Sequence, residues 1–78
     1  MTLDEMSVGS YGIIREVHCE KSFRRRLLDM GLTPKTKIMV RKVAPMGDPI
    51  EVFLRGYELT LRKEDARCIV VEERNGVL

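Results

Sequence analysis

Three side chains able to ligate a transition metal are consecutive in this sequence: His18, Cys19 and Glu20. Imidazole and thiolate are ligands that zinc and iron prefer. Adjacent residues of a strand point to opposite faces, however, so His18 and Cys19 are poorly placed to share one ion. Cys68 joins one of them only if the fold brings it near. The alternative is an exposed histidine beside a buried thiol.

The number and spacing of the cysteines limit which disulfides and which metal cofactors the chain could hold. The chain has two cysteines, whereas small secreted domains usually carry several disulfides, so we expect reduced thiols and leave one long-range disulfide open. No CxxC or HxxxH spacing occurs. We therefore predict no firmly bound cofactor. Weak binding of Fe or Zn through His18, Cys19 or Cys68 is the open alternative.

Three consecutive arginines, Arg24, Arg25 and Arg26, are the most informative charges. With Ser22 as the N-cap of a helix, they occupy its first turn, where each cation opposes the helix dipole by about 0.3–1 kcal/mol. Residues that lower the stability of a helix are often retained because they serve a function. The arginines, with Asp29 near the other end of the helix, then form a docking patch for an acidic partner. The alternatives are a solvated face or a nucleic-acid patch.

A second candidate surface is a stiff loop made of Pro45, Met46, Gly47, Asp48 and Pro49. Two prolines and a glycine restrict this loop, so it can present Met46 to a partner at little ordering cost. The alternative is ordinary turn chemistry, with Met46 tucked over the mouth of the domain.

The sequence shows no catalytic apparatus. Its single histidine cannot be assigned to a Ser-His-Asp or Cys-His setting, and no GxxxxGK[ST] motif is present to bind a nucleotide. The net charge of +2 is modest for a nucleic-acid binder. A chain of 78 residues also has little core to spare for a substrate cleft. We predict that the protein is not an enzyme and does not bind nucleic acid.

Neither a linker nor a repeat divides the chain, so we predict one domain over residues 1–78, with residues 73–78 as a frayed tail. Its longest aliphatic run, Ile69 to Val71, is far too short to span a bilayer. The acidic N-terminus does not resemble a signal peptide. We expect a cytoplasmic chain without membrane insertion, as a monomer or weak homo-oligomer.

Period-two alternation predicts short strands over residues 11–17, 37–42, 50–55, 57–62 and 68–72. Such strands bury their apolar faces best by curling into a small barrel. We predict a mainly β fold: a small barrel of five to six short antiparallel strands, one short helix after the first strand, and a helical turn before the last. The predicted core is aliphatic and comprises Ile13, Val17, Leu27, Ile38, Val40, Ile50, Val52, Leu59, Leu61, Ile69 and Val71.

Local signals place the helix and the turns. Phe23, Leu27 and Met30 form one apolar stripe, and Gly31 stands where a C′ glycine ends a helix, with Leu32 as its usual apolar contact. The dipeptide at 55–56 predicts a short hairpin turn, and residues 63–66 predict a single helical turn.

Four segments together, in this order, resemble the FeoA family, small cytoplasmic accessory proteins of bacterial ferrous iron transport. They are Leu27–Pro34, Ala44–Pro49, Leu54–Gly56 and Leu59–Ala66. The resemblance runs from about Leu3 to Val71. It implies an SH3-like barrel and a non-catalytic partner of FeoB, the membrane iron permease with a cytosolic GTP-binding domain. The two candidate surfaces would then form the contact, at the inner face of the membrane.

The same module also resembles the C-terminal SH3-like domain of iron-dependent repressors. That likeness keeps a metal-binding or metal-sensing module as the alternative function.

One position departs from the family pattern. Lys35 follows Thr33 and Pro34, where the family usually has glycine. A Pro-Gly pair suits a type II turn, whose second central residue has a positive φ. Lysine there predicts either a type I turn or a strained backbone.

Overall fold

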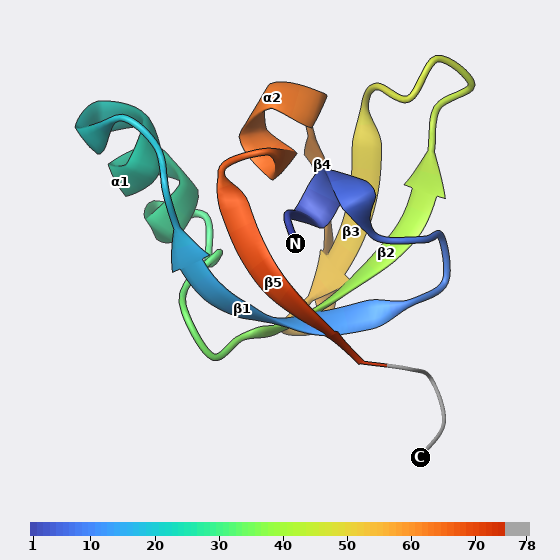
Figure 1. Ribbon diagram of the computed structural model, residues 1–78, viewed down its shortest axis with the longest axis horizontal. Helices are drawn as coiled ribbons and strands as arrows, with labels where there is room; N and C mark the ends of the chain where they lie inside the picture. Colours follow the sequence, from blue (N-terminus) through green and yellow to red (C-terminus); the bar gives the residue numbers. More distant parts are fainter. Residues whose placement is uncertain (75–78) are drawn as a thin grey trace.

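Eight short elements make up residues 1–74, the part of the chain that this computed structural model describes (Figure 1). In chain order they are the 3-10 helix η1 (Leu3–Glu5), β1 (Tyr11–Val17), α1 (Lys21–Asp29), β2 (Lys37–Val43), β3 (Ile50–Leu54), β4 (Tyr57–Leu61), α2 (Lys63–Ala66) and β5 (Ile69–Arg74). The predicted helix after the first strand and the predicted helical turn before the last strand are both confirmed.

The five strands form one antiparallel sheet in the order β4-β3-β2-β1-β5. The sheet curls, and Figure 1 shows η1 and α2 on its concave side. Thr2, next to η1, bridges to Val70 of β5 and fastens the N-terminal segment to the edge of the sheet. The prediction of a mainly β fold built from short antiparallel strands is confirmed, with five strands in residues 1–74.

One cluster of aliphatic side chains fills the space inside the curled sheet. All predicted core residues except Ile13 and Leu59 are buried in it. The cluster comprises Leu3, Met6, Ile14, Val17, Leu27, Leu32, Ile38, Val40, Ile50, Val52, Leu54, Leu61, Ala66, Ile69 and Val71. Leu59, on the edge strand β4, is only half-buried. The N-terminal segment and α2 thus contribute core residues that strand periodicity could not indicate.

The prediction of Ile13 as a core residue is wrong, and Ile14 is fully buried in its place. The register of β1 against β5 shifts between Ile14 and Glu16, so Arg15 is an extra residue in β1. A bulge of this kind moves the residues that follow to the other face of the strand. Ile14 and Val17 can therefore both point inward despite their odd spacing.

Helix α1 begins two residues earlier than the Ser22 cap predicts, at Lys21 instead of Phe23. Glu20 is the N-cap, and its carbonyl accepts the first helical bond from the Arg24 amide at 2.7 Å. The Ser22 hydroxyl donates to the Glu20 carboxylate at 3.0 Å instead of capping the helix. The three arginines consequently lie in the second turn, where the helix dipole opposes them less. No helix in residues 1–74 is long and apolar enough to cross a membrane.

The predicted end of α1 is confirmed. Gly31 has a φ of 98°, and its amide donates to the Leu28 carbonyl at 3.0 Å. The Leu32 amide donates to the Leu27 carbonyl at 3.1 Å, which completes a Schellman motif. Both Leu27 and Leu32 are fully buried. The end of the helix is therefore fastened to the core by the same turn that ends it.

Two further turns use left-handed backbone. Arg55 and Gly56 have φ values of 50° and 87°, typical of a type I′ hairpin turn, which confirms the predicted turn between β3 and β4. Lys35 has a φ of 72°, and the Thr36 amide closes the turn on the Thr33 carbonyl at 3.2 Å. Of the two alternatives for lysine at this position, the structure has the strained one.

The predicted frayed tail is wrong for its first two residues. Glu73 and Arg74 belong to β5, where they pair with Gly12 and Tyr11 of β1. The rest of that prediction, residues 75–78, lies outside the described residues.

Replacing Lys35 with glycine should raise the free energy of unfolding by roughly 0.5–1 kcal/mol. Glycine relieves a left-handed penalty of about 1–2 kcal/mol, part of which is offset by the greater freedom of glycine in the unfolded chain. Urea denaturation measures the difference. Lys37→Gly, in the extended backbone of β2, is the control and should destabilise. A Lys35→Gly chain no more stable than the parent would contradict the strained turn.

Candidate functional site

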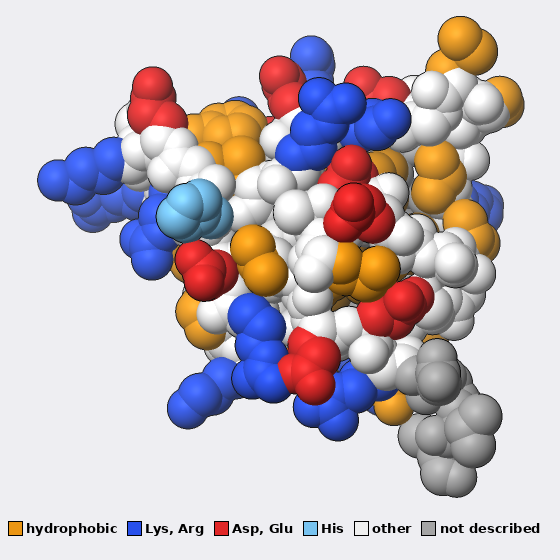
Figure 2. Space-filling view, viewed as in Figure 1, with side chains coloured by type: hydrophobic (Ala, Val, Ile, Leu, Met, Phe, Trp, Pro, Cys, Tyr) orange, Lys and Arg blue, Asp and Glu red, His pale blue; other side chains and the backbone are white. Residues whose placement is uncertain are grey.

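Helix α1 presents its arginines outward because its other side is committed to the core. Leu27 is fully buried, and Phe23, Leu28 and Met30 pack partly against the core cluster. With 3.6 residues per turn, the positions between these apolar side chains face away from the sheet. The space-filling view shows Lys and Arg side chains gathered at the end of the molecule that α1 forms (Figures 1 and 2).

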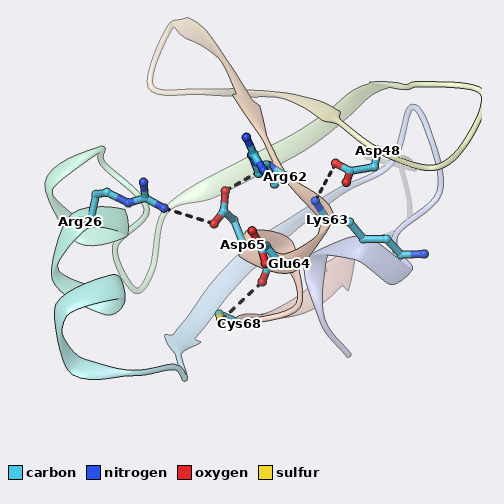
Figure 3. A network of polar contacts seen from close by, with 7 residues as sticks. All are labelled: Arg26, Asp48, Arg62, Lys63, Glu64, Asp65 and Cys68. Atoms are coloured by element: carbon cyan, nitrogen blue, oxygen red, sulfur yellow. Dashed lines mark hydrogen bonds and ion pairs between the residues drawn. The ribbon is translucent and has the colours of Figure 1, made fainter.

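Two of the three guanidinium groups are tethered. The Arg24 Nε donates to the Val17 carbonyl at 3.0 Å, at the end of β1. The Arg26 guanidinium lies 3.5 Å from the Asp65 carboxylate and stacks 4.8 Å from the centre of the Phe23 ring (Figure 3). These contacts limit the rotamers of both side chains while leaving much of each exposed.

Arg25 is different, because no ion pair or side-chain hydrogen bond holds it within residues 1–74. It borders an open depression of about 560 Å³, whose other lining residues are Glu20, Lys21, Ser22, Arg24 and Leu28. Leu28 is the one aliphatic residue of that lining. An unpaired guanidinium beside a small apolar floor suits a partner that offers a carboxylate next to an apolar side chain.

Asp29 is exposed as the last residue of α1. A carboxylate there opposes the negative end of the helix dipole. Its side chain makes no hydrogen bond or ion pair in the described part of the chain. Asp29 thus adds a negative charge at the end of the cationic helix.

The loop over residues 45–49 points outward, with the Met46 side chain 90% exposed. The alternative that Met46 tucks over the mouth of the domain is therefore wrong. The Gly47 amide donates to the Ala44 carbonyl at 2.7 Å, and the Ala44 amide donates to the Pro49 carbonyl at 3.0 Å, which closes the loop on itself. The Asp48 carboxylate accepts from the Lys63 amide at 3.0 Å and ties the loop to α2 (Figure 3).

The structure does not bring the two candidate surfaces together. Helix α1 lies at one end of the molecule, and the loop between β2 and β3 lies at the other (Figure 1). The principal extents are 35, 28 and 23 Å, so a partner must be wide to touch both. Each surface is therefore a separate patch.

Three residues that position α1 were not predicted from the sequence. Asp65 is buried and accepts from the Arg62 amide at 3.1 Å as well as facing Arg26. The Arg55 guanidinium donates to the Gly31 carbonyl at 3.3 Å, and the Tyr57 hydroxyl donates to the Met30 carbonyl. An acid in the first turn of a helix is a recognisable signal for Asp65. No local signal marks Arg55 or Tyr57, whose partners are distant in sequence.

The candidate metal ligands are only partly assembled. The His18 side chain is 82% exposed and lies 3.2 Å from the Glu16 carboxylate. Cys68, by contrast, lies next to the segment that carries Cys19, since the His18 amide donates to the Cys68 carbonyl at 2.6 Å, and both cysteines are free and half-buried. Burial raises the pKa of the Cys68 thiol to about 11, and the neighbouring Cys19 side chain adds to the effect. Residues 1–74 contain no group of three or more His, Cys, Asp or Glu that could hold an ion.

Two adjacent thiols without a third ligand do not fit the four-ligand geometry that zinc adopts in closed sites. The Cys68 thiol instead donates to the Glu64 carbonyl at 3.7 Å, as a protonated group does (Figure 3). The geometry thus offers a dithiol rather than a formed metal centre.

Solved structures of low sequence identity share the fold. FeoA from Stenotrophomonas maltophilia complexed with zinc, described as a procaryotic SH3 domain protein, is 22% identical, with a TM-score of 0.79 and 96% of each chain covered. A manganese-dependent transcriptional repressor is 17% identical, with a TM-score of 0.87 over 95% of this chain and 36% of the repressor. Identities this low show the fold alone, and they confirm the SH3-like barrel.

Relatives of higher identity narrow the family. The solution structure of an FeoA-like protein from Clostridium acetobutylicum is 42% identical, with a TM-score of 0.86, and the match covers 92% of this chain and 84% of that one. A fusion of Fe(2+) transport protein A with the Fe(2+) transporter FeoB, from Porphyromonas gingivalis, is 38% identical over 72 residues. That match covers 92% of this chain and only 8% of the fusion protein. The model of the FeoA domain matches residues 1–73. The chain therefore belongs to the FeoA domain family.

Proposed function

We propose that this chain is a non-catalytic accessory protein of ferrous iron uptake. It binds the cytosolic part of an FeoB-type permease at the cytoplasmic face of the membrane, through the outward face of α1. The observation that carries this proposal is the unpaired Arg25 guanidinium beside an open depression on a helix whose other arginines are tethered.

The fusion relative supports the choice of partner. In Porphyromonas gingivalis a domain similar to this chain is joined to the FeoB transporter in one polypeptide. Linking two modules holds each at a high effective concentration near the other. Such a linkage is useful when the two modules act at the same place, which favours a direct contact when they are separate chains.

Electrostatics favour α1 as the contact. Arg24 and Arg26 are held by Val17 and Asp65, so their guanidinium groups lose little rotamer freedom on binding. Arg25 is free to form a bidentate pair with a carboxylate. Arginine is also enriched among the residues that dominate interface energies. An acidic surface on the cytosolic part of the permease is the complementary partner.

The loop over residues 45–49 is a second, separate contact in this proposal. Its closed backbone presents Met46 without ordering cost, and an exposed methionine suits an adaptable apolar pocket. Asp48 has a structural task in this loop, since its carboxylate is already bound to the Lys63 amide. Met46 is therefore the residue through which the loop would contribute.

Reversing the charge of Arg25 should weaken binding to the purified cytosolic part of FeoB by at least about tenfold, because like charges then meet in the contact. Titration calorimetry at low and high salt measures the change, and affinity of the parent chain should fall as ionic strength rises. Arg74→Glu, at the far end of β5, makes the same charge change and should leave the affinity nearly unaltered. Equal effects of Arg25→Glu and Arg74→Glu would reject the α1 patch.

A second candidate function is a metal-binding or metal-sensing module. It is favoured by one observation, the pairing of β1 with β5, which brings Cys68 next to the segment that carries Cys19. The relative from Stenotrophomonas maltophilia was solved as a zinc complex, which supports testing this candidate with zinc. His18 would join only by turning away from Glu16.

With two thiols as the ligands, we expect the chain to show no saturable Zn(II) uptake at about 10 µM metal, because structural zinc sites of high affinity use four ligands. Titration calorimetry of the reduced chain under argon checks this expectation, and the same titration with Fe(II) extends it. Stoichiometric uptake that disappears in Cys68→Ser but survives in His18→Ala would contradict it and favour the metal-binding module.

A further inference from the structure

The fold brings together two cysteines that are far apart in sequence. Cys19 follows β1 and Cys68 precedes β5, and these two strands are neighbours in the sheet, with Val17 opposite Ile69. Beyond that pair, the His18 amide donates to the Cys68 carbonyl at 2.6 Å. The end of β1 and the start of β5 are thus fixed side by side by backbone bonds.

The two side chains share one environment. Both cysteines are half-buried and pack against the same core cluster. The Cys68 thiol donates to the Glu64 carbonyl at 3.7 Å, and the nearby Cys19 contributes to raising its pKa. No third cysteine exists in the chain to compete for either sulfur.

We propose that Cys19 and Cys68 are a redox modification site, which closes to an intramolecular disulfide by exchange with a small-molecule disulfide such as oxidised glutathione. This inference does not rest on the proposed function. It concerns the two thiols alone and needs no metal.

The exchange balances in two steps. The Cys19 thiolate attacks one sulfur of oxidised glutathione, forms a mixed disulfide and releases one glutathione thiolate, which takes up a proton. The Cys68 sulfur, after losing its proton, then attacks the Cys19 sulfur and releases the second glutathione. Two cysteine thiols are oxidised and one glutathione disulfide is reduced to two thiols.

The bond would fasten the start of α1 to the junction of α2 and β5. Cys19 directly precedes Glu20, the N-cap of α1, and Cys68 lies two residues after the end of α2. The Arg26–Asp65 ion pair already joins the same two helices. Oxidation would therefore add a covalent restraint to a contact that is present in the reduced chain.

The test compares disulfide closure in the folded and unfolded chain. The reduced protein is equilibrated with glutathione buffers of known ratio, in the presence of a metal chelator, with and without a denaturing concentration of urea. After acid quenching and alkylation, mass spectrometry measures the fraction that carries the intramolecular bond. The equilibrium constant for closure should be at least about tenfold larger in the folded chain, because the fold holds the segments that carry the two cysteines side by side. A constant equal to or smaller than that in urea would overturn the proposal.

Two further products are measured by the same mass spectrometry. In Cys68→Ser the folded chain should stop at the mixed disulfide on Cys19, whereas the parent should pass through it to the closed form. Disulfide-linked dimers, or a stable mixed disulfide as the main product of the parent chain, would also overturn the proposal. The principal comparison uses the parent sequence on both arms, so it does not depend on whether a variant folds.

Discussion

The position of α1 depends on one packing constraint, the burial of Leu27 and Leu32 on either side of a left-handed glycine. A helix of nine residues is unstable in water without tertiary contacts. Leu27 fastens its inner face, and the turn through Gly31 folds Leu32 back beneath its end. Because that side of the helix is buried in the core, the arginines on the opposite side face solvent. The cationic face is thus a consequence of how the apolar residues pack.

Residues from distant parts of the chain then hold the helix in place. Arg55, in the turn between β3 and β4, donates to the Gly31 carbonyl, and Tyr57, the first residue of β4, donates to the Met30 carbonyl. At the other side, Asp65 of α2 faces Arg26. Carbonyls at the end of a helix have no partner within the helix, and leaving them unpaired costs free energy. These hydrogen bonds remove that cost. The outward face of α1 is therefore supported by the turn between β3 and β4, by the first residue of β4 and by a second helix.

Structural features whose physical cause lies within a few residues could be predicted from the sequence. Period-two alternation identified the strands, and Gly31 followed by Leu32 identified the end of α1, because both signals lie within a few residues. The prediction failed at Ile13, since the bulge at Arg15 depends on the pairing of β1 with β5. Ser22 was mistaken for the N-cap because a serine is the commoner cap, although Glu20 holds that position. The adjacency of Cys19 and Cys68, like the contacts of Arg55, arises only when strands distant in sequence meet.

We propose that α1 is the face that meets the permease, and a residue-by-residue map of the contact is the decisive measurement. Backbone amide signals of the labelled chain would be followed by NMR as the unlabelled cytosolic part of FeoB is added. The largest shifts should fall in α1, residues Lys21–Asp29, with a second, smaller group around Met46. Shifts centred on the exposed side of β2 and β3, with α1 unperturbed, would contradict it.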